Sequence, residues 1–258
     1  MSDSLEAESQ PVLADSATAE QPPVYSLSSV HTRSFPELLR LLGASIVVST
    51  YQAGKLVFLR ADTEGLNTHF RSFIRPMGIA SGGGRLWLGT ATEIWEFHNS
   101  SSIARSLEPA DKHDACFLPR HVRFTGDIQV HEMSVAGGDL WFINTRFSCL
   151  CTLDDVHSFV PQWQPPFITD VSPEDRCHLN GLAMKDNLPA FVTALGTSNE
   201  RRGWRENKRT GGVVISIADN DVVARGLCMP HSPRWHQGKL WVLESGTGSL
   251  GTVDLTRG

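Results

Sequence analysis

Residues 177–183 read Cys-His-Leu-Asn-Gly-Leu-Ala, where a His-x-Asn pair runs directly into a small residue and an apolar strand. The same layout begins at residues 78, 134 and 232: a small residue, a short apolar strand, a turn, and a second apolar strand. The four starting points lie 56, 47 and 51 residues apart. A period of roughly 40–50 residues with several strands per unit is typical of propeller blades. We therefore predict an all-β fold, a β-propeller with blades of about 50 residues.

The number of blades follows from counting units outward from this stretch. Each unit continues into a third strand, and residues 46–59 form a further partial unit with a Gly-containing turn. This predicts four to five blades. A propeller closes its ring to protect strand edges, and no closing element follows the last strand, so we expect an incomplete propeller. A β-sandwich or a mixed α/β domain is the alternative, which the scarcity of helical stretches disfavours.

The N-terminal region differs in composition from the rest. Residues 1–30 hold five acidic residues, no Lys or Arg and few apolar residues. They predict a disordered acidic tail ahead of a propeller domain at residues 31–258. One short helix is predicted over residues 34–43, with Ser34 as its N-cap and Gly43 as its C-cap.

Charge and cysteine content exclude several classes of function. The net charge of −5 arises in the tail, because the other 228 residues carry 23 basic and 28 − 5 = 23 acidic side chains. Without a basic excess we expect no nucleic-acid partner. Without a basic amphipathic helix or an apolar run of ~20 residues we expect no membrane partner. Five cysteines without metal spacing indicate a reduced, cytoplasmic protein.

Several polar residues of the repeats are predicted to share one mouth. In a propeller, the loop before each innermost strand and the loop between the second and third strands emerge on the same face, where binding residues concentrate. His178 and Asn180 are two apart and are expected to point the same way. Asn180 and His231 align with Met77 and Met133 of the earlier units. The predicted ligand-binding residues are His131, Glu132, Asn144, His178, Asn180, His231 and Glu244.

A metal ion is one candidate occupant of this mouth. His178, Asn180 and His231 are the predicted ligands of one divalent ion, since imidazole suits zinc, copper or iron and amide or carboxylate oxygens suit calcium or magnesium. No local ligand spacing such as H-E-x-x-H supports them. The alternative is that these side chains hydrogen-bond neighbouring loops, as buried polar groups must.

The longest loop at this face is basic. Residues 197–209 carry five Lys or Arg and two Glu, with Trp204 between arginines. The loop is either a lid over the mouth or a solvated segment. An apolar ring in such a loop favours the lid.

Three functions fit these observations. The first is binding of a small polar ligand, with or without a metal ion. The second is a metal-assisted hydrolase or isomerase, with His178 or Glu132 as general base and Asn180 positioning metal or substrate. The third is a platform that binds a protein partner.

Several longer motifs resemble a family of functionally uncharacterised bacterial proteins known as a domain of unknown function. The matching stretches are STYQAGK at 49–55, NTRFSCL at 144–150, CHLNG at 177–181 and MPHSPRW at 229–235. The resemblance covers residues 34–258, implies that members extend beyond this chain, and implies no established activity. More distantly, the layout is similar to calcium-dependent lactonase propellers, which gather Glu, Asn and Asp ligands at the mouth. Asn180 is the residue of this chain that corresponds in residue type to one of those ligands.

Overall fold

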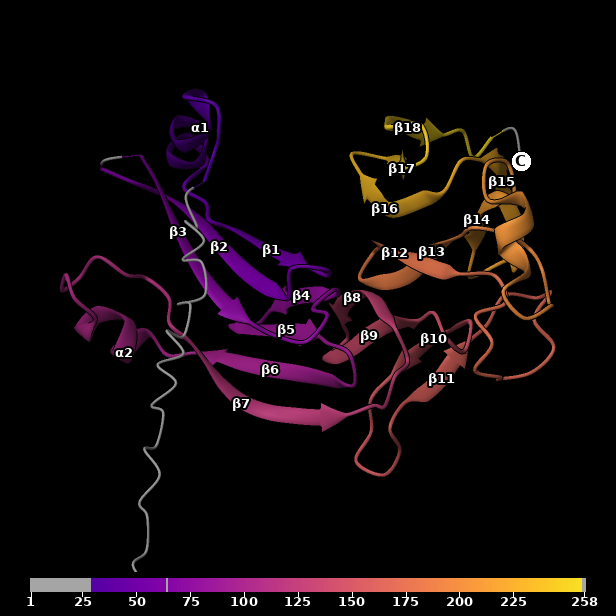
Figure 1. Cartoon of the computed structure of the whole chain (residues 1–258), viewed down its shortest axis with the longest axis horizontal. Helices are drawn as coiled ribbons and strands as arrows, with labels where there is room; N and C mark the ends of the chain where they lie inside the picture. The colour runs from indigo at the N-terminus through magenta and orange to yellow at the C-terminus, as the bar shows by residue number, and fades with distance from the viewer. Residues whose placement is uncertain (1–28, 64, 257–258) are drawn as a thin grey trace, which may run out of the picture.

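The computed structural model describes residues 29–63 and 65–256, which fold into five antiparallel sheets arranged along an arc (Figure 1). Within each sheet the strands lie in chain order. The predicted all-β propeller is confirmed, with five blades in the described residues. Residues 1–28 of the predicted acidic tail lie outside the described residues.

The strands of the first three sheets have the following bounds. The first sheet comprises β1 (Ile46–Thr50), β2 (Lys55–Asp62) and β3 (Gly65–Ser72). The second comprises β4 (Ile79–Gly82), β5 (Arg85–Gly89), β6 (Glu93–Asn99) and β7 (Phe117–Phe124). The third comprises β8 (Val130–Ala136), β9 (Asp139–Asn144), β10 (Cys149–Thr152) and β11 (Val160–Trp163).

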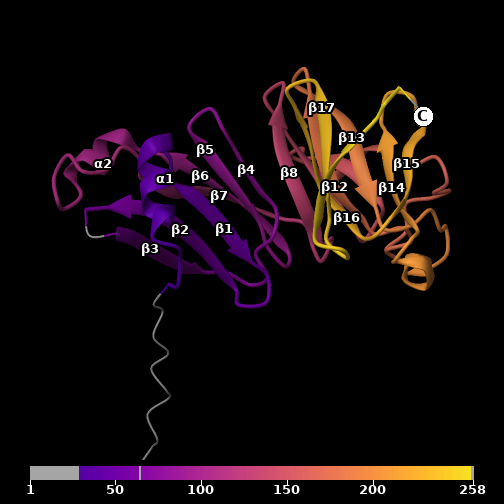
Figure 2. The same ribbon diagram turned by 90° about the horizontal axis from the view of Figure 1, so that it is seen from above.

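The last two sheets complete the arc. The fourth comprises β12 (Leu179–Lys185), β13 (Leu188–Ala194), β14 (Gly212–Ser216) and β15 (Val222–Leu227). The fifth comprises β16 (Pro230–His236), β17 (Lys239–Glu244) and β18 (Ser249–Val253). Seen from above, β8, β12 and β16 lie side by side (Figure 2), and the contacts between these strands place them innermost.

Helices are few in the described residues. The predicted helix is α1 (Ser34–Leu42), which packs against β2 and β3, with Leu39 buried. Gly43 ends it in a left-handed conformation, as predicted. The predicted N-cap is wrong: Arg33 occupies that position, and no side chain caps the helix. The sequence reading also missed α2 (Ser101–Ser106), between β6 and β7, and a 3-10 helix, η1 (Gly203–Asn207).

Separate apolar clusters fill the spaces between neighbouring sheets. Phe142 packs toward the second sheet with Trp87, whereas the adjacent Ile143 packs toward the fourth sheet with Val192. Successive residues of a strand point to opposite faces, so a strand between two neighbours is apolar at every position. This explains why the inner halves of the repeats read as short apolar runs.

Hydrogen bonds join the innermost strands from blade to blade. In each case a donor from one blade reaches a backbone carbonyl within two residues of the start of the following inner strand. The four links are Ser49 Oγ to Met77 O, Gly78 N to Val130 O, Thr145 Oγ1 to Leu179 O, and Asn180 Nδ2 to Pro230 O. They hold together the starts of the inner strands, where the predicted site residues lie.

No helix within 29–63 and 65–256 combines the length and the apolar character that a transmembrane segment requires.

Candidate functional site

Strand pairing defines equivalent positions at the start of three inner strands. Val130 pairs with Asn144, Leu179 with Ala194, and Pro230 with Glu244. In each pair the second residue is the last of its strand. The residues that follow the three strand starts are therefore equivalent, namely His131, Asn180 and His231.

This register corrects the predicted alignment of Asn180 and His231 with Met133. His131 is the equivalent residue, and Met133 lies two positions further on. The small residue from which the match was counted does not lie at the same depth in each strand. Ser134 pairs with Trp141, three positions before Asn144, whereas Gly181 pairs with Thr193, one position before Ala194. A match counted back from the small residue is therefore displaced by two positions.

The residue just before each of these strands is left-handed. Gln129, His178 and Met229 have φ angles of 56°, 51° and 53°. Non-glycine residues adopt this conformation rarely. His178 therefore lies in the turn before β12, where side chains do not alternate between the two faces of the sheet. The prediction that His178 and Asn180 point the same way because they are two residues apart is thus wrong. Their hydrogen-bond partners also differ.

His131 and His231 make matching contacts in the third and fifth blades. The Nδ1 atom of His131 lies 2.9 Å from Thr145 Oγ1, and that of His231 lies 3.2 Å from Ser245 Oγ. Each hydroxyl donates its own proton to a backbone carbonyl, of Leu179 or Met229 respectively. A hydroxyl has one proton, so each must accept from the imidazole. Nδ1 then carries the ring proton, and Nε2 is left as an acceptor.

His178 lies at the centre of the site. Its ring centroid is 4.9 Å from that of His131 and 4.4 Å from that of Trp204. Its Nδ1 atom is 3.1 and 3.2 Å from the two carboxylate oxygens of Asp175. Trp204 Nε1 donates to the same carboxylate at 3.1 Å. Asp175 therefore fixes both rings, and leaves His178 Nε2 unengaged by the protein.

Asp175 is the functional candidate that the sequence reading missed. It is buried, although it lies in a loop. Its spacing of three residues from His178 was the available signal, since the side chains can meet only when the intervening turn folds back. No periodicity predicts such a turn.

Burial keeps two of these imidazoles neutral. Burial lowers the pKa of His131 to about 3, and the proximity of His178 and His231 adds to the effect. The pKa of His231 is lowered by burial first and by His178 second, against an opposing hydrogen bond to Met229 O. His178 lowers the pKa of both His131 and His231, so these two histidines both lie within its electrostatic influence.

Glu132 is engaged by neighbouring blades. Its carboxylate forms an ion pair with Arg234 of β16 and accepts the backbone N–H of Leu182 in β12. Burial raises the pKa of Glu132, and Arg234 opposes that rise. The carboxylate thus connects three inner strands, which differs from a free ligand-binding group.

The three remaining predicted residues serve backbone groups. Asn144 Oδ1 accepts the N–H of Phe147, and its buried Nδ2 faces the Cys151 thiol rather than a stronger acceptor of the described residues. Glu244 Oε2 accepts the N–H of Cys228. Asn180 accepts from Thr193 at 2.6 Å and donates to Pro230 O at 3.1 Å. Both ends of the Asn180 amide are therefore used by the protein.

The loop carrying Trp204 covers His178 from one side. Arg202 N–H donates to Glu174 O at 3.1 Å, which anchors the loop beside Asp175. A Cβ on Gly203 would lie 2.0 Å from Ser198 Oγ, so the turn needs glycine. The basic side chains of the loop are exposed, and only Trp204 approaches the histidines. The lid interpretation therefore rests on the tryptophan alone.

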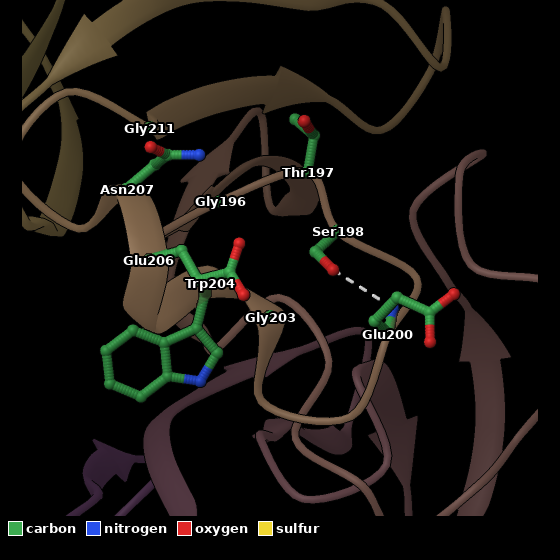
Figure 3. A pocket seen from close by; sticks show the side chains of 9 residues that line it. All are labelled: Gly196, Thr197, Ser198, Glu200, Gly203, Trp204, Glu206, Asn207 and Gly211. Atoms are coloured by element: carbon green, nitrogen blue, oxygen red, sulfur yellow. Dashed lines mark hydrogen bonds between the residues drawn. The ribbon is translucent and has the colours of Figure 1, made fainter.

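A cavity of about 340 Å³ lies beneath this loop (Figure 3). Its lining is mostly polar and includes three glycines. The lining residues are Gly196, Thr197, Ser198, Glu200, Gly203, Trp204, Glu206, Asn207 and Gly211. Trp204 belongs both to this cavity and to the histidine cluster.

A family model described as a domain of unknown function (DUF4915) matches residues 33–258. No curated protein matches the chain.

Solved structures similar to this chain include virginiamycin B lyase from Staphylococcus aureus, at 9% identity and a TM-score of 0.46. The match covers 81% of this chain and 62% of the lyase, so the chain spans less than two thirds of that protein. Glutaminyl cyclase from Myxococcus xanthus matches at 13% identity and a TM-score of 0.43, over 82% of this chain and 88% of the cyclase. AztD from Citrobacter koseri matches at 9% identity and a TM-score of 0.37, over 82% of this chain and 56% of AztD. At these identities no activity carries over.

Proposed function

Because the chain belongs to the family described as a domain of unknown function (DUF4915), we propose its function from its own site: it binds a small polar molecule at the mouth formed by His131, His178 and His231. One observation carries the proposal. All three imidazoles hydrogen-bond the protein through Nδ1, and none hydrogen-bonds through Nε2 to any residue that the structure describes. Three ring nitrogens are thus left to meet a ligand.

The tautomers define the chemistry of that ligand. Nδ1 bears the proton in each ring, because its partners are carbonyl or carboxylate oxygens or hydroxyls that already donate elsewhere. Each Nε2 then offers a lone pair. The complementary ligand presents hydrogen-bond donors, as the hydroxyl groups of sugars, polyols and hydroxy acids do. The Trp204 ring beside His178 suits the apolar face of such a molecule.

A divalent metal ion is a second candidate, supported by the same tautomers. Metal-binding histidines are usually neutral and donate their other ring N–H to a carboxylate or carbonyl, as His131, His178 and His231 do here. The nitrogens are not gathered within 4.8 Å of one another, so the rings would have to move together on binding. Asn180 Oδ1 already accepts from Thr193 Oγ1, so the predicted participation of Asn180 would use the second lone pair of that oxygen.

The Asp175–His178 pair supports an enzymatic variant of this proposal. A carboxylate on Nδ1 orients an imidazole and stabilises its protonated form, so Nε2 can take a proton from a bound substrate. His178 would be the base of a hydrolase or isomerase, with or without the metal ion. The ion pair with Arg234 makes Glu132 a poorer base.

Ligand titration of the purified full chain tests the proposal. Calorimetry with a panel of monosaccharides, polyols and hydroxy acids, and separately with Zn²⁺ and Ca²⁺, is expected to find a probe whose affinity falls at least about tenfold in His178→Ala and Asp175→Asn. The matched control is His236→Ala, an exposed histidine of β16. Equal affinity in all variants, or no heat with any probe, would contradict binding at this mouth.

We also propose a cytoplasmic location. All five cysteines are free, including Cys149 and Cys151, whose sulfur atoms lie 3.4 Å apart. Free thiols in such proximity are compatible with a reducing compartment. Quantifying free thiols in protein purified without reductant tests this, because five reactive thiols after denaturation are expected.

A further inference from the structure

A second cluster of metal-binding side chains lies away from the central mouth, on the two outer strands of the second blade. Glu96 and His98 belong to β6, and His121 belongs to β7. Within the described parts of the chain, these three form the one group of His, Cys, Asp or Glu whose donor atoms all lie within 4.8 Å of one another. Glu96 pairs directly with His121 across the two strands.

Sheet geometry explains why the three side chains converge. Glu96 and His98 are two residues apart on β6, so both point to the same face. A bulge after Glu96 brings His121, rather than its neighbour, opposite the carboxylate. His98 Nε2 lies 2.7 Å from Glu96 Oε1, and the His98 and His121 ring centroids are 6.0 Å apart.

We propose that Glu96, His98 and His121 bind a divalent transition-metal ion of the Zn²⁺ class. Two imidazoles and one carboxylate are a recurrent protein ligand set for zinc, with a fourth position left for water. Tetrahedral zinc with bonds of about 2.0–2.2 Å holds its donors roughly 3.3 Å apart. The present separations therefore require only side-chain rotations.

The adjacent charges are compatible with a cation. Burial acts to raise the pKa of Glu96, but hydrogen bonds from His98 and Arg85 outweigh it and leave the pKa lowered. The carboxylate is therefore ionised near neutral pH. Arg85 Nη1 lies 3.4 Å from Glu96 Oε1, and its guanidinium also packs over Trp87 at 5.1 Å. This positive charge weakens metal affinity. It does not block the sheet face that carries the three ligands, because the guanidinium can remain over the Trp87 ring.

A bound metal ion would cross-link the two outer strands of the blade, β6 and β7. β7 is the outermost strand, and six of its eight residues are exposed. Few apolar contacts hold such a strand, so it opens readily. A metal ion joining β6 to β7 would raise the protection of β7 against hydrogen exchange.

Zinc titration of the full-length protein provides the test. Saturable binding of one Zn²⁺ is expected by calorimetry, with slower hydrogen exchange in β7. Affinity is expected to fall at least about tenfold in His121→Ala and in His98→Gln, and to rise several-fold in Arg85→Gln.

Two controls separate this site from others. His157→Ala removes another exposed, carboxylate-paired histidine and should leave zinc affinity within about twofold. His178→Ala removes the central imidazole, and it should also leave this zinc event unchanged. Zinc binding that is lost in His178→Ala but retained in His121→Ala and His98→Gln would overturn the proposal and assign the ion to the mouth. Absence of zinc binding in the folded wild type would overturn it outright.

Discussion

His178 owes its position to a backbone conformation that a side-chain pattern does not reveal. The left-handed turn before β12 directs the ring toward His131 and Trp204, and Asp175 holds it there. Residue types predicted that histidines would gather. They could not predict Asp175, because the fold of a loop decides which carboxylate reaches which ring. Strained non-glycine positions of this kind are frequent at functional sites.

The lowered pKa of His131 predicts a loss of stability in mild acid. The folded protein keeps this ring neutral down to pH 3, whereas the unfolded chain protonates it below pH ~6.5. The stabilisation is therefore present above pH ~6.5 and is lost as pH falls from there toward 3. Because proton binding and folding are linked, protonation of this residue in the unfolded chain lowers the free energy of unfolding by about 2 kcal/mol between pH 7 and pH 5.

Urea unfolding at pH 7 and pH 5 measures this loss. His131→Gln keeps a polar side chain that does not titrate. Between pH 7 and pH 5, the free energy of unfolding of this variant should therefore decrease by about 2 kcal/mol less than that of the wild type. His236→Gln, on an exposed face of β16, should behave as the wild type. Equal pH dependence in His131→Gln and the wild type would mean that the folded protein protonates this ring readily.

At the scale of the strand, the inner three strands of each later blade were predictable from the sequence, but their register was not. Apolar runs and Gly-containing turns located the hairpins, since they reflect burial on both faces and tight reversals. The bulges at Val130, Leu179 and His231 leave no such signature, because one extra residue preserves composition. Ser134 is small like Gly181 but lies two positions further into its strand, and for this reason Met133 was aligned where His131 belongs.

Close approach of inner strands makes Gly181 sensitive to a single methyl group. A Cβ there would lie 2.3 Å from Pro233 Cδ and 2.3 Å from Thr193 Oγ1. Pro233 belongs to the next blade and its ring is rigid, so the strands would have to separate. We expect Gly181→Ala to lower the free energy of unfolding by roughly 1–3 kcal/mol, the usual cost of overpacking.

The matched change is Gly251→Ala in β18, where nothing lies within 4 Å of the new Cβ. It should alter stability by less than about 0.5 kcal/mol. Denaturant unfolding of both variants decides the question. Equal effects would show that the blades are not in contact at Gly181.

At the scale of the molecule, the length of the sequence repeat predicted the fold. The equivalence of positions in successive blades predicted the candidate site only in part. A repeat of about 50 residues is enough to indicate a propeller, since each unit is one sheet. It could not separate the polar residues that gather in the histidine cluster from those that join blades. Asn180 and His231 occupy equivalent positions, yet Asn180 bonds to the next blade while His231 contacts its own loop.

The blade-to-blade links predict how the arc comes apart. The buried Asn180 amide bonds to Pro230 O at the first residue of β16. Asn180→Ala removes that bond and leaves a buried carbonyl without its partner, which costs about 1–3 kcal/mol. Because the link holds the fifth sheet to the fourth, the loss should appear first as faster hydrogen exchange in β16–β18, before β12–β15 responds.

Asn67→Ala is the control, because Asn67 bonds to Arg60 at 2.9 Å within the first sheet alone. It should change exchange only in β2 and β3. If Asn180→Ala instead raised exchange equally across all five sheets, the blades would open as one cooperative unit. In that case the hydrogen bond between Asn180 and Pro230 would contribute to the stability of the whole arc rather than to the attachment of its last sheet.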